Sequence, residues 1–464
     1  MPDPDLHAEP FVHLVDVTHD SALIGWGAFY FARHWRSDRW EILDDSELPQ
    51  RCGRRTSIGH GAEPFGEATV QVYDQAGRVV AEESTADRAW VWVEGLEPDT
   101  AYSYRVLVDG EEWAAGERWD WVEDERGGFD LAKAGRGYDL RLRTFPRPDA
   151  PTPPVRFVAL GDYGVGIRSD SESSRRQRRI ADVLDRVLDD LDPRFVVSLG
   201  DNIYQGELGA VDDESGGEDD DWYSSFFQPY RYLLARIPVF PAIGNHDTTD
   251  TEGADDRAQM EDNFHLATRF GGEGRDRVGP GLFYTVRYGA DLELVCIDTS
   301  QDPEEDVSRH FLGPEQASWL SRVFARPDVR WRIPFSHHPT YCAGPSHEND
   351  DEMLRALEPL YDAADIRLVL AGHEHNFQIG RVDHRTYVVS GAAGKIREEH
   401  PRRLGELGVD AWAGHAHLLV VEIEGDRALL TPYSGLLRDG RPHPMTAQNR
   451  DGEHRRPPFV VEGG

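Results

Sequence analysis

Lysine is nearly absent from this chain of 464 residues. Only Lys133 and Lys395 occur, so arginine supplies almost all of the 50 basic side chains, which face 85 acidic ones. The net charge of −35 repels the phosphates of nucleic acids and the surfaces of anionic membranes. We therefore expect neither a nucleic acid nor a membrane among the binding partners.

Cysteines and long apolar runs are also scarce. The three cysteines, Cys52, Cys296 and Cys342, are widely spaced and form no CxxC or zinc-finger pattern, which argues against a disulfide framework. No run approaches the ~18 apolar residues that a membrane-spanning helix needs. The start, MPDPDLHAEP, has neither the basic nor the apolar region of a secretory signal, so a cytoplasmic location is expected.

Residues 1–148 contain short runs in which apolar and polar side chains alternate. The clearest are SALIGWGAFYF, ATVQVYD, RAWVWVEGL and AYSYRVLVDG, rich in Val, Tyr and Trp and divided by turn residues. This pattern predicts an antiparallel β-sandwich. The stretch PRPDAPTPP at residues 146–154 is too rich in proline for a helix or a central strand. We place a sandwich domain at 1–148, a linker at 149–155 and a second domain at 156–464.

The second domain has a different pattern. Runs such as VRFVAL, RFVVSL and IRLVLA do not alternate and predict strands that are buried on both faces. Segments such as SRRQRRIADVLDRVLDDL and GPEQASWLSRVFA predict helices between them, so this domain is of the α/β class. HLLVVEIEGDRALLTPYS predicts a hairpin that turns at Gly425 and Asp426. Two acidic stretches, residues 211–221 and 247–256, are expected to be solvated loops.

Five of the apolar runs end in side chains that can bind a metal ion. Ligand sites of α/β sheets lie beyond the carboxyl ends of the strands, so all five groups can meet in one crevice. The repeated glycine before the polar residue fits a tight turn that brings the backbone close to such a site. The groups are Gly161-Asp162-Tyr163-Gly164, Gly200-Asp201-Asn202-Ile203-Tyr204, Gly244-Asn245-His246-Asp247, Ser336-His337-His338-Pro339 and Gly372-His373-Glu374-His375-Asn376.

This order of motifs resembles the calcineurin-like metallophosphoesterases and, among them, the purple acid phosphatases. The family pattern GDxG, GDxxY, GNH, His before Pro, and GHxH is present here as GDYG, GDNIY, GNHD, SHHP and GHEH. The resemblance implies a four-layer α/β/β/α domain over residues 156–464. It extends to the N-terminal domain, because GLEPDTAYSYRV resembles the fibronectin type III signature and larger members carry such a domain.

The resemblance also implies roles for the residues. Asp162, Tyr204 and His375 would hold a first metal ion, Asn245, His337 and His373 a second, and Asp201 would bridge the two. The pair would be Fe(III) with Fe(II), Zn(II) or Mn(II), which suits a set of carboxylate, phenolate, imidazole and amide ligands. Two metal ions can clamp an in-line displacement at phosphorus and generate the attacking hydroxide.

Two further histidines are candidates for catalysis. His246 follows Asn245 and would contact phosphate and protonate the leaving group, and His347 would share this work. A second GHxH segment, Gly414 to His417, is not expected to bind the catalytic metals, because no buried apolar strand precedes it. His338 is also set aside, since adjacent residues on an extended segment point to opposite sides.

The function expected from these residues is the hydrolysis of phosphate monoesters by a dinuclear-metal enzyme. A phosphodiesterase that acts on cyclic nucleotides or on nucleotide-sugar and pyrophosphate bonds is the alternative within enzymes. A non-catalytic metal-containing binding module is the alternative from another class, and it predicts at least one lost ligand. The resembled family is mostly exported, which opposes the cytoplasmic expectation. The oligomeric state stays open.

Overall fold

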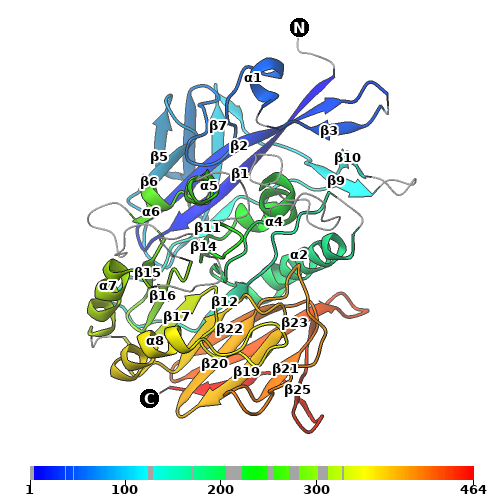
Figure 1. Cartoon of the computed structure of the whole chain (residues 1–464). Helices are drawn as coiled ribbons and strands as arrows, with labels where there is room; N and C mark the ends of the chain where they lie inside the picture. The colour runs from blue at the N-terminus through cyan, green and yellow to red at the C-terminus, as the bar shows by residue number, and fades with distance from the viewer. Residues whose placement is uncertain are drawn as a thin grey trace.

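The computed structural model describes residues 5–463 except residues 37, 45, 124–128, 169–170, 205–221, 249–254, 271–281, 301–311 and 327–328. The acidic stretch 211–221 and most of 247–256 therefore lie outside the described residues. Figure 1 shows the β-rich N-terminal segment at the top, helices in the middle, and the sheets of the C-terminal part at the bottom.

The N-terminal segment consists of antiparallel sheets. Its elements are β1 (Leu6–Val17), β2 (Ser21–Arg33), β3 (Trp40–Ile42), α1 (Leu48–Arg51), β4 (Ala68–Tyr73), β5 (Val79–Thr85), β6 (Trp90–Glu94), β7 (Ala101–Val108), β8 (Glu111–Glu112), β9 (Trp119–Glu123), β10 (Phe129–Lys133) and β11 (Arg141–Arg143). One sheet has the order β1-β2-β3 with β6 beside β2, and another β11-β7-β4-β5 with β8 beside β7. Burial alternates along β4 and β7, as predicted for strands with one solvated face. A β-rich N-terminal region is thus confirmed.

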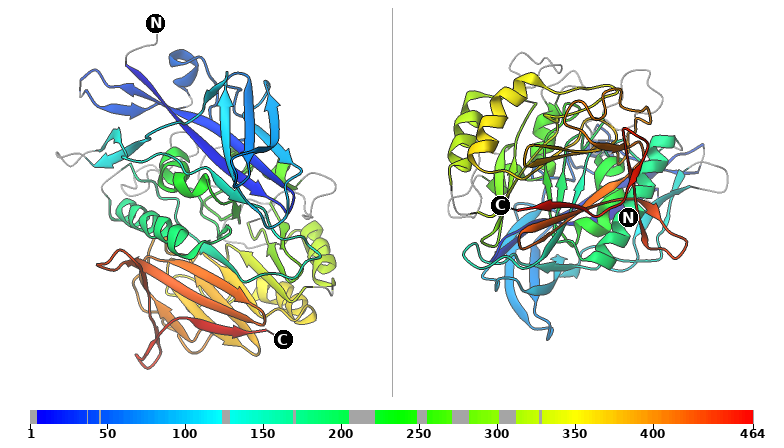
Figure 2. Two further views of the ribbon diagram at one scale, coloured as in Figure 1. Left: turned by 180° about the vertical axis from the view of Figure 1, so that it is seen from behind. Right: turned by 90° about the horizontal axis from the view of Figure 1, so that it is seen from below.

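The prediction of alternating burial is wrong for β2. Nearly all of its residues are buried, because η1 (Tyr223–Phe227) packs against the face that would otherwise meet water, while α4 (Gln228–Leu234) packs on the neighbouring β1. The ring centroids of Phe29 and Tyr223 lie 4.6 Å apart, and those of Phe11 and Phe227 lie 4.7 Å apart. One hydrophobic core therefore runs from the N-terminal sheets into the second half of the chain. Figure 2 shows this arrangement from behind.

Two mixed sheets form the second half. The first has the order β14-β13-β12-β22-β23-β24 with β27 beside β23, and β12, β13 and β14 run parallel. Its strands are β12 (Val155–Leu160), β13 (Val196–Ser198), β14 (Val239–Pro241), β22 (Leu418–Glu424), β23 (Arg427–Leu436), β24 (Pro442–Pro444) and β27 (Phe459–Glu462). The predicted hairpin is β22–β23.

The second sheet has the order β15-β16-β17-β18-β20-β19-β21-β25-β26, and its central strands β16, β17, β18 and β20 are parallel. Its strands are β15 (Tyr284–Tyr288), β16 (Leu292–Cys296), β17 (Trp331–Ser336), β18 (Leu368–Ala371), β19 (Phe377–Val382), β20 (Arg385–Ser390), β21 (Ala411–Ala413), β25 (Ala447–Asn449) and β26 (His454–Arg455).

Helices cover the outer faces of both sheets. α2 (Glu172–Leu191) packs on the first sheet, and α7 (Pro314–Phe324) and α8 (Asp351–Ala363) pack on the second. α5 (Asp255–Asn263) and α6 (Leu266–Phe270) lie instead beside the N-terminal sheets (Figure 1). Leu368 and Leu370 of β18 join the core shared by the two sheets, whereas Val369 between them packs with α7 and α8. The apolar side of α2 contacts β23 of the first sheet. The predicted α/β/β/α layering is confirmed. None of the described helices is long and apolar enough to span a membrane.

Candidate metal centre

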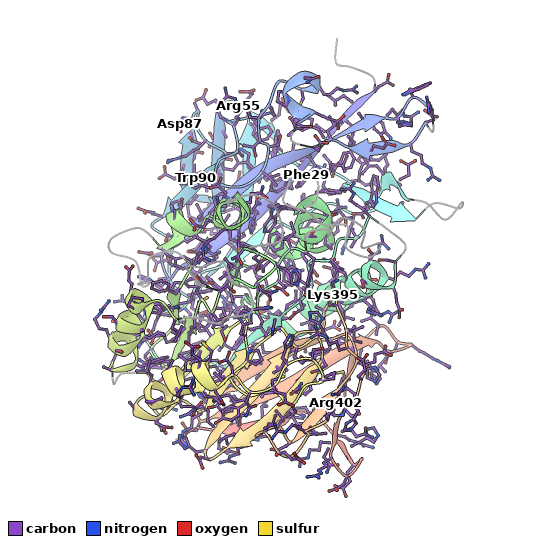
Figure 3. All side chains as sticks on the ribbon, in the orientation of Figure 1. Phe29, Arg55, Asp87, Trp90, Lys395 and Arg402 are labelled. Carbon is purple, nitrogen blue, oxygen red and sulfur yellow. The ribbon has the colours of Figure 1, made fainter. Side chains whose placement is uncertain are left out.

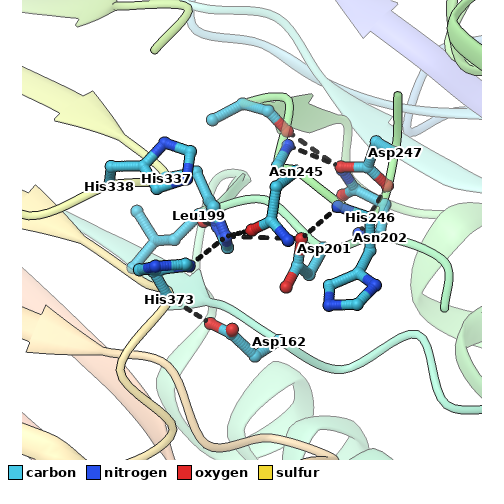
Figure 4. Close-up of polar contacts among 12 residues, drawn as sticks. Asp162, Leu199, Asp201, Asn202, Asn245, His246, Asp247, His337, His338 and His373 are labelled. Carbon is cyan, nitrogen blue, oxygen red and sulfur yellow. Dashed lines mark hydrogen bonds and ion pairs between the residues drawn. The ribbon is translucent and has the colours of Figure 1, made fainter. Parts of the chain in front are cut away.

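Five of the seven predicted metal-binding residues, labelled in Figure 4, meet at the carboxyl ends of the parallel strands. Asp162, Asp201 and Asn245 follow β12, β13 and β14 of the first sheet. His337 and His373 follow β17 and β18 of the second sheet. Oxygen and nitrogen atoms of Asp162, Asp201 and His337 all lie within 4.8 Å of one another. The two sheets therefore contribute to one site.

Glycine is required before these residues because the backbone segments approach very closely. A Cβ atom on Gly244 would lie 2.2 Å from Asp201 Oδ1. A Cβ atom on Gly200, whose φ is +87°, would lie 2.5 Å from His337 Nδ1. The turns expected from the repeated glycine are thus needed to bring the polar groups together.

His337 lies at the centre of a group of hydrogen-bond acceptors. Its Nδ1 lies 2.8 Å from the carbonyl oxygen of Leu199 and donates to it. In a neutral ring this leaves a lone pair on Nε2, which is 3.0 Å from Asn245 Oδ1, 3.1 Å from His373 Nδ1 and 3.3 Å from Asp201 Oδ1. The two oxygens, of Asn245 and Asp201, are acceptors that face this lone pair, which fits a cation between them, and the backbone bond at Nδ1 is typical of a metal-binding histidine.

Asp162, Tyr204 and His375 form a second group beside it. The Tyr204 hydroxyl is 3.2 Å from both Asp162 Oδ1 and His375 Nε2, and Asp162 Oδ1 is 3.3 Å from His375 Nε2. The other oxygen of Asp162 accepts the backbone N–H of His373 at 2.9 Å. Burial, followed by the charge of Arg397, lowers the pKa of His375 to about 3, so its ring stays neutral and keeps a lone pair.

Asp201 lies between the two groups. Its Oδ1 accepts the backbone N–H of His246 at 3.1 Å, while Oδ2 is buried without a hydrogen-bond partner among the described residues. Burial raises the pKa of Asp162 to about 8. Burial acts in the same direction on Asp201, but neighbouring imidazoles, first that of His337, outweigh it and lower its pKa. Two buried carboxyl groups with one unpartnered oxygen fit a site for cations.

The two predicted catalytic histidines border this site. The ring of His246 is 4.5 Å from that of Tyr204. The ring of His347 stacks on His373 at 3.9 Å, and its Nδ1 lies 2.7 Å from Glu374 Oε2. Its side chain is 35% exposed, so the rest of the ring can meet a substrate.

Some residues that shape the site were not predicted. The buried Asp247 accepts N–H groups from Gly244 at 2.7 Å and from Asn202 at 2.9 Å, and so ties the GNHD turn to the GDN turn. Its position directly after GNH was an available signal. The segment around Lys395 and Arg397 carries no motif, although Lys395 Nζ lies 4.8 Å from the centroid of the Tyr204 ring.

The second GHxH segment does follow a buried apolar strand, the short β21, which pairs with β19 and β25. His415 is exposed, and His417 Nε2 is 3.0 Å from Ser390 Oγ. Neither belongs to the metal-capable clusters found in the described part of the chain.

His338 was predicted to point away from the site, as adjacent residues of an extended segment do. This prediction is wrong, because β17 ends at Ser336 and the backbone is no longer a strand at His338. The ring of His338 lies 4.4 Å from that of His373. Its Nδ1 is 2.8 Å from Thr299 Oγ1, and ligand atoms of His337, His338 and His373 lie within 4.8 Å of one another. His338 therefore borders the site rather than pointing away from it.

Comparison with known proteins agrees with this geometry. Residues 155–377 match the family described as "Calcineurin-like phosphoesterase". This part of the chain is a calcineurin-like phosphoesterase domain. Tartrate-resistant acid phosphatase type 5 of Oryctolagus cuniculus is 26% identical over 271 residues, which cover 53% of this chain and 75% of the relative. Purple acid phosphatase 3 of Arabidopsis thaliana is 24% identical over 274 residues, which cover 55% of this chain and 67% of that relative.

Solved structures show the same fold. Purple acid phosphatase PPD1 from yellow lupin (Lupinus luteus) seeds superimposes with a TM-score of 0.59 at 14% identity, over 98% of this chain and 74% of that one. PhoD superimposes with a TM-score of 0.61 at 14% identity, over 98% of this chain and 93% of the PhoD chain. The phosphoesterase is therefore a hydrolase of phosphoric esters that is homologous to purple acid phosphatases.

Proposed function

We propose that this phosphoesterase is a dinuclear-metal phosphatase that hydrolyses phosphate monoesters. The observation that carries the proposal is the convergence of unshared acceptors around His337 Nε2 and the unpartnered Oδ2 of Asp201. Asp162, Tyr204 and His375 would hold one ion, and Asn245, His337 and His373 the other. Asp201 lies where it could bridge them. All seven predicted positions lie at the site, which opposes a non-catalytic binding module with a lost ligand.

When bound, the two metal ions would polarise the phosphoryl oxygens and lower the pKa of a water molecule. The residues of the chain supply the other functions. His246 and His347 border the site and are candidates to bind phosphate and to give a proton to the departing oxygen. Asp247 and the glycines hold the loops in a fixed geometry.

The charges near the site favour monoesters over diesters. Lys395 lies over the Tyr204 ring, and the Arg397 side chain lies 3.3 Å from the buried Glu374 and 3.4 Å from the carbonyl oxygen of His373. A monoester dianion carries one more negative charge than a diester, so it gains more from nearby cations. We expect a larger kcat/KM for p-nitrophenyl phosphate than for bis(p-nitrophenyl) phosphate, and the reverse order would assign a phosphodiesterase.

Tyr204 provides the test of the metal assignment. Burial raises the pKa of its hydroxyl well above the usual range, so a phenolate here requires a cation. We propose Fe(III) at this position, with Fe(II), Zn(II) or Mn(II) as its partner. The iron-loaded protein should then show a visible charge-transfer band, and Tyr204→Phe should lose the band while it keeps most of its metal.

Absorbance spectra and metal analysis of the same samples measure both quantities. Tyr163→Phe is the matched control, because Tyr163 is also buried but donates to Asn202 Oδ1 at 2.7 Å instead of facing the acidic pair. A wild-type protein that binds iron without a visible band would show that Tyr204 is not a ligand.

A further inference from the structure

A cavity of about 970 Å3 lies outside the candidate metal centre, between the first half of α2 and the strand ends around β21, β24 and β26. Figure 1 shows α2 lying over β23, with β21 and β25 beside it. None of the seven predicted metal-binding residues lines this cavity. Its basic lining residues are Arg175, Arg176, Arg179, His415, His443 and His454.

The cavity is basic, although the chain as a whole carries a net charge of −35. Its two acidic lining residues are Glu172 and Glu398, and Glu172 is paired with Arg176 at 2.9 Å. Arg179 has no ion pair among the described residues, and it is exposed. All three arginines lie in the first two turns of α2. With the histidines neutral, three arginines and two glutamates leave the lining with a net positive charge, which favours an anionic ligand.

A single chain segment separates this cavity from the metal centre. Lys395 faces the Tyr204 ring, and the backbone N–H of Arg397 donates to the carbonyl oxygen of His375 at 2.6 Å. The neighbouring residues Ile396 and Glu398 line the cavity instead. Figure 3 labels Lys395 in the middle of the molecule, above the sheets of the C-terminal part. The cavity therefore lies directly behind the metal centre, and its ligand would not contact the metals.

We propose that this cavity is a second anion-binding site, which takes a small molecule with several phosphate groups. One arginine side chain can donate two parallel N–H groups to two phosphate oxygens. Three arginines on one helix can therefore contact more than one phosphate. The volume lies at the upper end of the range for small-molecule sites, so it exceeds what a single phosphate ion requires. The side chains of His415 and His443, which also line the cavity, supply further N–H donors.

The test measures binding of inositol hexakissulfate to the metal-loaded, full-length protein by isothermal titration calorimetry. This probe presents several anionic groups, and it holds no phosphate ester that the phosphoesterase could hydrolyse. The double variant Arg175→Ala/Arg179→Ala removes two exposed arginines and should raise Kd at least about tenfold, since hydrogen bonds to charged groups are lost. Arg186→Ala removes an exposed arginine of the same helix that does not line the cavity, and it should bind as the wild type does.

Asp201→Asn separates this inference from the proposed catalytic function. It alters the metal centre and should leave the affinity for the probe unchanged, whether or not the enzyme is a monoesterase. The proposal is wrong if the wild type binds no probe, or if Asp201→Asn abolishes binding while the double variant keeps it. If Arg186→Ala weakened binding of the probe as much as the double variant does, the proposal would also be wrong. That result would mean that the overall charge of the helix attracts the probe, without a specific site.

Discussion

At the scale of single residues, His246 is positioned by its neighbours. It follows Asn245 in the turn after β14, its backbone N–H donates to Asp201 Oδ1, and its ring lies beside Tyr204. The seven predicted ligand positions are filled without it. Its ring can therefore face a substrate that is bound at the metal centre.

We expect His246→Ala to slow the hydrolysis of alkyl phosphates more than that of p-nitrophenyl phosphate. An alkoxide needs a proton to leave, whereas nitrophenolate leaves without one, and general acid catalysis contributes about 10²–10⁴ in rate. The measurement is kcat for both substrates at equal metal content. His347→Ala should show the same selectivity to a smaller degree. Equal slowing of both substrates, with both metals retained, would mean that His246 binds phosphate or orients hydroxide instead.

At the scale of elements, the two GHxH segments follow strands that pair differently with their neighbours. β18 lies between β17 and β20 in the parallel centre of its sheet, so its carboxyl end opens toward the other ligand groups. β21 pairs antiparallel with β19 and β25, and His417 after it is buried against Ser390. Burial lowers the pKa of His417 to about 4, so it acts as a neutral residue of the core.

Replacing His373 or His375 with alanine should therefore remove metal and activity together. His417→Ala should keep a metal content near that of the wild type, because the ring is outside the metal cluster. It should lower the free energy of unfolding by about 1–3 kcal/mol through a lost hydrogen bond and lost packing. Metal analysis and urea unfolding of each variant distinguish these results. Loss of metal in His415→Ala or His417→Ala alone would reverse the assignment of the two segments.

At the scale of the whole molecule, buried histidines lie between the N-terminal sheets and the phosphoesterase part. His13 of β1 packs against Phe226 and Phe227 of η1, and its ring centroid is 6.4 Å from that of His265. Burial, with the charge of Arg269, lowers the pKa of His13 to about 3. Burial also lowers the pKa of His265 well below its usual value. Both rings are thus neutral in the folded protein.

This arrangement predicts that acid weakens the folded state. The unfolded chain takes up a proton at each histidine below about pH 6.5, whereas the folded chain does so only near pH 3 at His13. The stabilisation is therefore complete above pH 6.5 and is lost as the pH falls. Between pH 7 and pH 5 each such histidine should cost about 2 kcal/mol of unfolding free energy.

Urea unfolding of wild type and His13→Gln at a series of pH values tests this prediction. The variant should lose a smaller part of its unfolding free energy between pH 7 and pH 5, whatever its stability at pH 7. His443→Gln is the control, because it replaces an exposed histidine on β24, away from this interface. Identical pH slopes in the wild type and His13→Gln would contradict the prediction.

The net charge also belongs to this scale. The expectation that nucleic acids and anionic membranes do not bind rests on the net charge of −35 and stays a prediction. The basic cavity beside α2 shows why total charge alone does not decide the question, since three arginines from one helix gather there. Total charge describes long-range repulsion, while a short-range site depends on which side chains share a surface.

The sequence alone determined the strands that end in metal-binding residues, the helices between them and the position of each motif. These features are local: an apolar run, a glycine and a polar side chain occupy neighbouring positions, so their pattern is visible without the fold. Glu374 and Asp247 lie within these same motifs, but which groups they would hydrogen-bond was not visible there.

The contacts between distant segments depend on how the chain packs in three dimensions. The tertiary structure packs η1 against β2, stacks His347 on His373, buries the short β21, and brings Arg179 and His415 into the lining of one cavity. Each of these depends on how sheets and helices pack against one another, because packing joins residues whose separation along the chain carries no periodic signal. The chemistry of each strand end is therefore readable in the sequence, while the surroundings of the site are set by packing.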